Sequence, residues 1–186
     1  MATVQSPPAT LDDLALVSEK AELIGGRIVY YMATGWKPGK VGGRIFRNLA
    51  DYADATGRGE ALPDNVGFAV PVLASGRQSF SPDVAFLFGP FPANPMRFIE
   101  APPMLAVEVR SEGDYGPAAG AEMAAKRADY FEAGTLVVWD VDPVTECIQA
   151  YRPDSPDRPV TYRRGQVAAA EPVLPGWTIA VDWIFG

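Results

Sequence analysis

The sequence has no histidine and only one cysteine, Cys147, among its 186 residues. Without histidine, Ser-His-Asp and Cys-His relays are excluded, and so are zinc sites with imidazole ligands. A single cysteine excludes a disulfide within the chain and suits a reducing compartment, and we expect it to fill space in a strand because no histidine activates it. Acid–base or metal chemistry must therefore use carboxylates, lysines, tyrosines or water. All-oxygen ligation favours magnesium, calcium or manganese.

Long apolar runs and an excess of positive charge are also missing. No apolar run approaches the length that crosses a bilayer, and the first residues lack the basic start and apolar stretch of a signal peptide. We therefore expect no membrane association and a cytoplasmic location. The 16 lysines and arginines against 23 aspartates and glutamates give a net charge of −7, which argues against a protein that coats nucleic acid. A nucleic-acid enzyme is compatible with that total, because acidic metal ligands count in it until the cation binds.

The overall composition is that of an ordinary globular protein, with 48% hydrophobic and 21% charged residues. The length suffices for one substantial core, and no repeat or low-complexity tract marks a boundary. We expect a loose tail over residues 1–9 and a single α/β domain over residues 10–186.

Hydrophobic periodicity and turn residues predict alternating helices and strands. Thr10 and Asp13 resemble a capping arrangement that opens a helix over 11–21. Further helices are predicted over 40–55, after a loop at 35–39, and over 118–133. Strands are predicted over residues 27–32, 68–73, 81–88, 105–110, 136–141 and 146–151. Hairpins are predicted around residues 74–77, 142–143 and 164–165, an ordered loop over 88–104, and a closing segment over 177–185 that packs on the core.

Two of the predicted core strands each carry one carboxylate, Asp83 and Glu108. An unpaired buried carboxylate is costly, so these acids need an explanation. Side chains alternate across a strand, and if the two strands are neighbours the acids could converge on one point. Two carboxylates that close would raise each other's pKa unless a cation lies between them. A divalent metal would resolve the conflict and activate a water.

The predicted helix over 118–133 places Glu122, Lys126 and Tyr130 one turn apart on one face. One interpretation is a surface ion pair between Glu122 and Lys126 with an amphipathic tyrosine below it. The other is that Lys126 leans over the two carboxylates and stabilises an attacking hydroxide or the transition state. The acid-bearing strands that precede the helix favour the second interpretation.

A dense group of basic residues, the basic run, begins just before the predicted helix over 40–55 and continues along its first half. It comprises Lys37, Lys40, Arg44 and Arg47. A solvated helix face and a phosphate-facing surface are equally compatible with it.

Several short motifs follow one another in a characteristic order. They are Glu22-Leu23-Ile24-Gly25-Gly26, Ser81-Pro82-Asp83-Val84, Ala106-Val107-Glu108-Val109-Arg110-Ser111, Lys126 with Tyr130, Trp139 with Val141-Asp142-Pro143, and Pro172-Val173-Leu174-Pro175-Gly176. In these motifs nearly the whole chain resembles the Uma-two family of "putative restriction endonucleases", a branch of the PD-(D/E)XK nuclease superfamily. Three positions differ. Gly25 stands where the family commonly has an aspartate, and Lys40 lies near the place where it commonly has a histidine at the start of the next helix. Arg110 stands where the superfamily commonly has a strand lysine.

The resemblance implies a restriction-endonuclease-like core of αβββαβ type, with a mixed central sheet flanked by helices and additional C-terminal β-hairpins. It implies that Asp83 and Glu108 are metal ligands and that Glu22 adds a further acid from the first helical region. Lys126 would be the catalytic lysine, carried by the helix instead of the strand. The reaction implied is hydrolysis of a DNA phosphodiester by a water bound to Mg²⁺ or Mn²⁺. Arg110 and Tyr130 would contact the substrate.

The leading hypothesis is therefore a metal-dependent DNA endonuclease, in which the basic run guides the phosphate backbone. A homodimer would pair two sites to cut both strands. The alternative is a catalytically inactive nuclease-like fold that serves as a binding or assembly module, which the acidic net charge favours. A third interpretation, that the acids are only hydrogen-bonded core groups, requires several coincidences.

Overall fold

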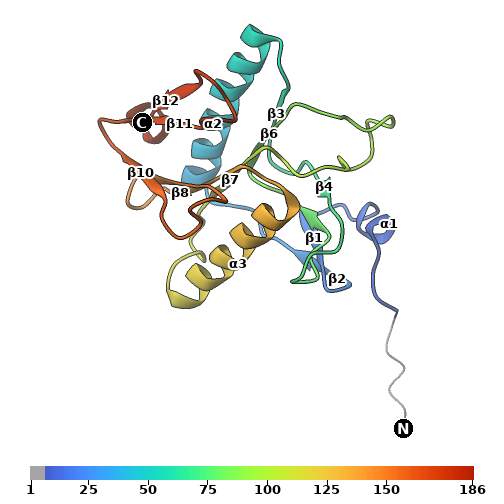
Figure 1. Ribbon diagram of the computed structural model, residues 1–186. Helices are drawn as coiled ribbons and strands as arrows, with labels where there is room; N and C mark the ends of the chain where they lie inside the picture. Colours follow the sequence, from blue (N-terminus) through green and yellow to red (C-terminus); the bar gives the residue numbers. More distant parts are fainter. Residues whose placement is uncertain (1–6) are drawn as a thin grey trace.

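A computed structural model of the chain describes residues 7–186 (Figure 1). Its centre is a six-stranded sheet with strand order β10-β9-β8-β7-β6-β3. These strands are β3 (Glu60–Leu62), β6 (Val84–Leu87), β7 (Leu105–Val109), β8 (Val137–Asp142), β9 (Cys147–Tyr151) and β10 (Val160–Arg163). Only β7 and β8 are parallel neighbours in this sheet. With α2 (Trp36–Thr56) before β3 and α3 (Pro117–Ala133) before β8, the predicted αβββαβ core with a mixed sheet is confirmed.

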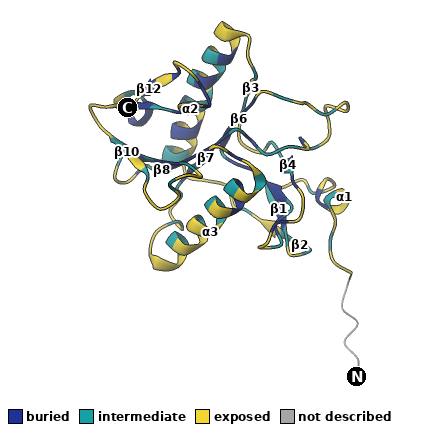
Figure 2. Cartoon of the chain, viewed as in Figure 1, coloured by how far each residue is buried: buried dark blue, intermediate teal, exposed yellow. Residues whose placement is uncertain are grey.

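The two long helices lie on opposite faces of this sheet (Figure 1). On one face, Val41, Ile45 and Leu49 of α2 pack with Val107 of β7 in one apolar cluster. On the other face, Tyr130 of α3 packs in a second cluster with apolar side chains of the same sheet. The central strands are buried along almost their whole length, and the exposed residues of the helices face outwards (Figure 2). Double coverage explains why the sequences of β6, β7 and β8 are almost continuously apolar.

The helix predicted over 40–55 begins four residues earlier, at Trp36, so that the predicted loop at 35–39 lies mostly in its first turn. Pro38 is accommodated there because the first turn needs no intrahelical N–H donor. The helix ends at Gly57, whose φ of 61° closes it with a left-handed cap. The helix predicted over 118–133 is confirmed as α3, which begins at Pro117.

The N-terminal prediction of a helix over 11–21 was too long. Thr10 and Asp13 do form the expected capping box, but α1 covers only Leu11–Leu14. The chain then enters β1 (Ala21–Ile24), which pairs antiparallel with β2 (Arg27–Tyr30). Pairing with β2 therefore overrides the helical pattern. Ala9 is also tied down, because its N–H donates to the Gly26 carbonyl, whereas the part of the predicted tail over residues 1–6 lies outside the described residues.

Two further strand predictions were too long. The segment 68–73 contributes only β4 (Phe68–Ala69), paired with β5 (Ser79–Phe80) around the predicted turn. The segment 81–88 contributes only β6, so Asp83 lies directly before the strand instead of within it. The loop predicted over 88–104 contains no helix or strand.

The hairpin predicted around 164–165 was wrong in its pairing. β10 pairs with β9, whereas β11 (Val167–Ala169) pairs with β12 (Thr178–Ala180), so the turn connects two different sheets. The closing segment packs on the core as predicted. Trp177 stacks on Trp139 at a ring-centroid distance of 5.2 Å, and α4 (Val181–Phe185) buries its apolar residues in the α2 cluster. Among the helices of residues 7–186, none is long and apolar enough to cross a membrane.

Candidate active site

A cleft of about 820 Å³ opens between the β1–β2 hairpin, α3 and the ends of the central strands. Five of the site residues predicted from the sequence line it: Asp83, Glu108, Arg110, Lys126 and Tyr130. Elements far apart in the sequence thus bring the predicted acids and the predicted lysine to one place.

Glu108 of β7 is the acid at the centre of this cleft. The Lys126 ammonium lies 2.9 Å from its Oε1, and the Tyr130 hydroxyl donates to the same oxygen at 2.6 Å. Burial raises the pKa of Glu108, and the negative charges of Asp83 and Glu22 raise it further, against the opposing charge of Lys126. Burial is thus the main cause of the raised pKa of Glu108, and the neighbouring carboxylates add to it in the direction expected for converging acids.

Glu22 lies on β1 and is completely buried. Its Oε1 accepts from the Ser81 N–H at 3.0 Å and lies 3.1 Å from the Lys126 ammonium. Its Oε2 accepts from the Tyr31 hydroxyl at 2.8 Å and forms an ion pair with Arg77. Burial alone would raise the pKa of this carboxyl, but Lys126, Arg77 and the hydrogen bonds outweigh it and lower the pKa to about 2. Glu22 comes from a strand instead of the helical region predicted, and both its oxygens are engaged.

Lys126 bridges Glu22 and Glu108 from α3, and it does not pair with Glu122 among the described contacts. Its ammonium also lies 5.4 Å from the centroid of the Tyr31 ring, on the side of the cleft formed by the hairpin. Burial alone would lower the pKa of Lys126. The negative charges of Glu108 and Glu22 have the larger effect and hold this pKa above its ordinary value. A lysine that stays protonated acts by its charge, not as a proton acceptor.

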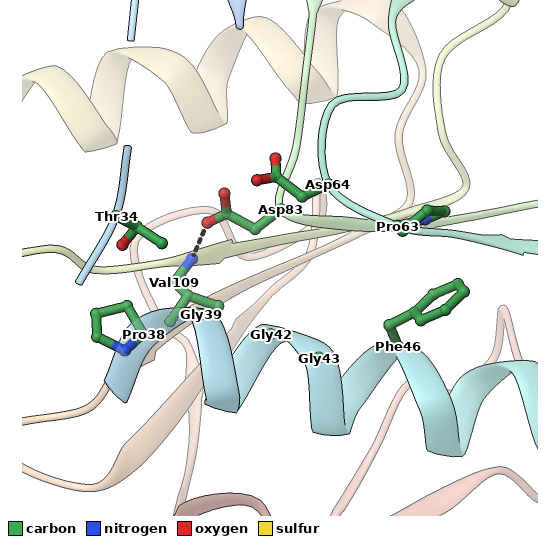
Figure 3. Close-up of a pocket in the computed structure, with 10 residues that line it drawn as sticks. All are labelled: Thr34, Pro38, Gly39, Gly42, Gly43, Phe46, Pro63, Asp64, Asp83 and Val109. Atoms are coloured by element: carbon green, nitrogen blue, oxygen red, sulfur yellow. Dashed lines mark hydrogen bonds between the residues drawn. The ribbon is translucent and has the colours of Figure 1, made fainter. Parts of the chain in front are cut away.

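Asp83 is held by a lysine that sequence reasoning missed. The Lys20 ammonium lies 2.7 Å from Asp83 and 2.6 Å from Asp64, while the Val109 N–H donates to Asp83 at 2.7 Å. Figure 3 shows the Asp64 and Asp83 carboxylates side by side above α2. The only local signal for Lys20 was its position two residues before Glu22, on the same face of an extended chain.

A smaller cavity of about 180 Å³ lies between these two acids and α2 (Figure 3). Gly39, Gly42 and Gly43 form its floor, and Phe46 and Val109 close its sides. The absence of side chains on these glycines leaves the surface of α2 open beneath Asp83.

Arg110 and Tyr130, both predicted to contact substrate, have protein partners in the structure. Asp140 of β8 accepts from Arg110 Nε and Nη2, each at 2.7 Å. Both residues border the cleft, but Tyr130 has no exposed surface, stacks on Phe80 and supports Glu108.

The basic run of α2 lies away from this cleft. Lys37 pairs with Glu146 at 3.2 Å, and Arg44 donates to the carbonyls of Trp183 and Ile184 at 2.8 and 3.2 Å. Lys40 and Arg47 lie over the rings of Trp36 and Trp183. None of the four basic residues borders either of the two cavities described above. Part of the run therefore fixes the C-terminal helix to α2.

The cleft offers two carboxylates to a divalent ion. Within residues 7–186, no group of three or more acidic, cysteine or histidine side chains is arranged to hold a metal. Asp83 and Glu108 do border one cleft, and Asp83 raises the pKa of Glu108, so a cation beside them would relieve their repulsion. Magnesium is commonly held by one or two carboxylates and keeps several waters. Asp83 and Glu108 border the cleft and fit such an ion, although Asp83 also binds Lys20 and the Val109 N–H. Glu22 fits less well, because it is completely buried and both its oxygens bind charged or polar partners.

The chain is similar to a described protein family and to a solved structure. The Uma2 family model, described as "Putative restriction endonuclease", matches residues 10–182. The chain belongs to the Uma2 family. A crystal structure of a "putative nuclease belonging to DUF820" from Anabaena variabilis is similar to the Uma2 chain, with a TM-score of 0.74 and 16% sequence identity. The match covers 96% of this chain and 98% of that one, and at this identity it shows a shared fold. No curated protein matches significantly. The description of the family supports a nuclease.

Proposed function

We propose that this Uma2 protein is a divalent-metal-dependent endonuclease that hydrolyses phosphodiester bonds of DNA. The observation that carries the proposal is the cleft that Asp83 and Glu108 both line, in which the protonated Lys126 lies 2.9 Å from Glu108. The family description supports the same class of activity.

Asp83 and Glu108 would hold Mg²⁺ or Mn²⁺. Such an ion, when bound, supplies a Lewis acid and lowers the pKa of a coordinated water. Glu22 would act on this centre indirectly, because its two oxygens bind Lys126, Tyr31, Arg77 and the backbone of Ser81.

The protein's own groups have separate roles in this proposal. Lys126 keeps its positive charge and would stabilise the negative charge that develops on the phosphate. Tyr130 fixes Glu108 through the hydrogen bond to Oε1. Asp140 engages two nitrogens of Arg110 and so orients the guanidinium, leaving Nη1 to donate to a phosphate oxygen.

DNA beyond the cleft would approach the exposed part of the α2 basic run, chiefly Lys40. Contacts of this kind add affinity without reading sequence. Cleavage of both strands would be served by a homodimer with two clefts. We place the activity in the cytoplasm, which the single cysteine favours.

A plasmid-nicking assay with Mg²⁺ or Mn²⁺ tests the proposal. We expect Asp83→Asn and Glu108→Gln to lower the nicking rate by at least about 100-fold, because each loses a metal ligand. Lys126→Arg keeps the charge that neutralises Glu22 and Glu108, so the variant should fold. Because the position of that charge changes, the variant should nick DNA more slowly than the wild type. Asp154→Asn, on the surface loop after β9, is the matched control and should nick at the wild-type rate.

An unchanged nicking rate in any of the three cleft variants would remove that residue from the mechanism. Calorimetric titration of the wild type with Mn²⁺ runs beside the assay. Metal binding without nicking of any DNA would favour the inactive binding module instead of the enzyme.

A further inference from the structure

Lys20 occupies the position that a cation would take between two carboxylates. Its ammonium lies 2.6 Å from Asp64 and 2.7 Å from Asp83, which come from different parts of the chain, after β3 and before β6. Burial alone would lower the pKa of Lys20, but the carboxylates of Asp83, Asp64 and Glu108 have the larger effect and raise it. The cleft therefore already contains a positive charge at one of the two proposed metal ligands.

The two lysine bridges of the cleft differ in how firmly they are held. Lys126 is bound to Glu22, which has no exposed surface, and to Glu108. Lys20 is bound to Asp64 and Asp83, whose side chains are 53% and 26% exposed. Breaking a buried ion pair is strongly destabilising, whereas an exposed pair can be exchanged for water at little cost. Lys126 and Glu108 are each 18% exposed, so the two bridges differ mainly at their other ends, where Asp64 is exposed and Glu22 is buried. The Lys20 bridge is therefore the one that opens more readily.

The backbone at Lys20 does not have to move when the bridge opens. Its carbonyl accepts from the Tyr31 N–H at 2.9 Å, which anchors this residue to the end of the β1–β2 hairpin. The side chain is 21% exposed, so a change of rotamer suffices to move the ammonium into solvent.

We propose that Lys20 is an exchangeable counter-ion of Asp83, which holds the cation position in the metal-free protein and leaves when a divalent ion binds. This inference rests on the proposed function, because it takes Asp83 as a metal ligand. A divalent ion beside Asp83 would be repelled by an ammonium held at the same carboxylate. Lys20 therefore lowers the affinity of the site for metal, and Asp64 contributes by anchoring Lys20.

Equilibrium binding of Mn²⁺ without DNA tests this role and needs no catalytic readout. Calorimetry would compare the wild type with Lys20→Met, which removes the charge, and with Lys20→Arg, which keeps it. We expect Lys20→Met to bind Mn²⁺ about tenfold more tightly and Lys20→Arg to stay close to the wild type. Arg158→Met, which removes one exposed positive charge from the loop after β9, is the matched control and should not change the affinity.

The outcomes separate this inference from the proposed function. If the wild type binds Mn²⁺ and Lys20→Met binds it equally or less tightly, the role of Lys20 is overturned while the metal centre stands. If neither protein binds Mn²⁺, the metal centre is overturned together with the inference. Lys20→Gln, which can still hydrogen-bond to both carboxylates, serves as the second neutral variant if Lys20→Met does not fold. A rise in melting temperature on adding Mn²⁺ that is larger in the neutral variant than in the wild type would support the same conclusion.

Discussion

Glu22 is the residue on which several contacts of the site converge, since Ser81, Tyr31, Arg77 and Lys126 all bind its two oxygens. The cost of burying this carboxylate is offset by two positive charges and by hydrogen bonds. Removing Lys126 altogether would leave Glu22 and Glu108 without their shared counter-charge. Lys126→Ala is therefore expected to weaken the fold as well as any activity.

The depressed pKa of Glu22 predicts a specific sensitivity to acid. Glu22 has its ordinary pKa of 4.5 in the unfolded chain and about 2 in the folded protein. The unfolded chain takes up the proton first as the pH falls, so this stabilisation is complete above 4.5 and is lost between about 4.5 and 2. The loss amounts to about 3 kcal/mol of unfolding free energy.

Urea unfolding at several pH values checks this prediction. Glu22→Gln should lose less stability than the wild type as the pH falls through that window, because glutamine does not titrate. Glu100→Gln, an exposed glutamate in the loop before β7, should keep the wild-type pH dependence. Parallel curves for the wild type and Glu22→Gln would show that Glu22 does not carry the acid sensitivity.

At the scale of elements, α2 combines glycines that cost stability with one that is required. Gly43 is exposed within the helix, and a Cβ there would meet no atom within 4 Å. Gly57 closes the helix with a φ of 61°, a conformation that side chains disfavour. The two glycines therefore predict opposite effects of the same substitution.

Gly43→Ala should stabilise the protein by about 1 kcal/mol and raise its melting temperature by about 2–4 °C. Gly57→Ala should destabilise it by about 1 kcal/mol, because alanine is strained in the left-handed region. Thermal unfolding by circular dichroism measures both changes. A lower melting temperature for Gly43→Ala would show that the open surface beneath Asp83 is not free to accept a methyl group.

The elements that could be predicted from sequence are those whose signals are local. β7 and α3 were predicted within one residue, because a bounded apolar run marks β7, and Pro117 and Gly134 mark the ends of α3. The N-terminal helix was predicted too long because its start has a local capping signal, whereas the strand that follows is set by pairing with β2. The hairpin at 164–165 failed because its two arms pair with other strands. Asp83 and Glu108 were predicted as acids in apolar strands, and Lys126 was predicted from its helix face and from motif order. Lys20 and Asp64 were not, since their contacts span 44 and 63 residues.

At the scale of the whole molecule, the net charge of −7 works against binding of DNA. The cleft adds to this repulsion locally through Asp64, Asp83 and Glu108. Affinity for the phosphate backbone should therefore depend on a divalent cation that neutralises these acids, more than on the basic run of α2.

Fluorescence anisotropy with a short labelled duplex measures this dependence. We expect the protein to bind DNA at least about tenfold more tightly in Ca²⁺ than in EDTA at matched ionic strength. Ca²⁺ is chosen because it takes the same oxygen ligands as Mg²⁺. The difference should disappear in Asp83→Asn. An equal gain in that variant would place the cation outside the proposed centre.

The β1–β2 hairpin forms no part of the six-stranded sheet, yet the segment of residues 20–22 delivers one positive and one negative charge to the acids of that sheet. A fragment that began after this hairpin would keep α2, α3 and every strand of the core. It would nevertheless leave Asp83 without its lysine and Lys126 without its buried partner. The smallest unit that can carry the complete site is therefore larger than the smallest unit that preserves the sheet. In evolutionary terms, changes in this short arm can retune the charge of the cleft without altering the architecture that supports it.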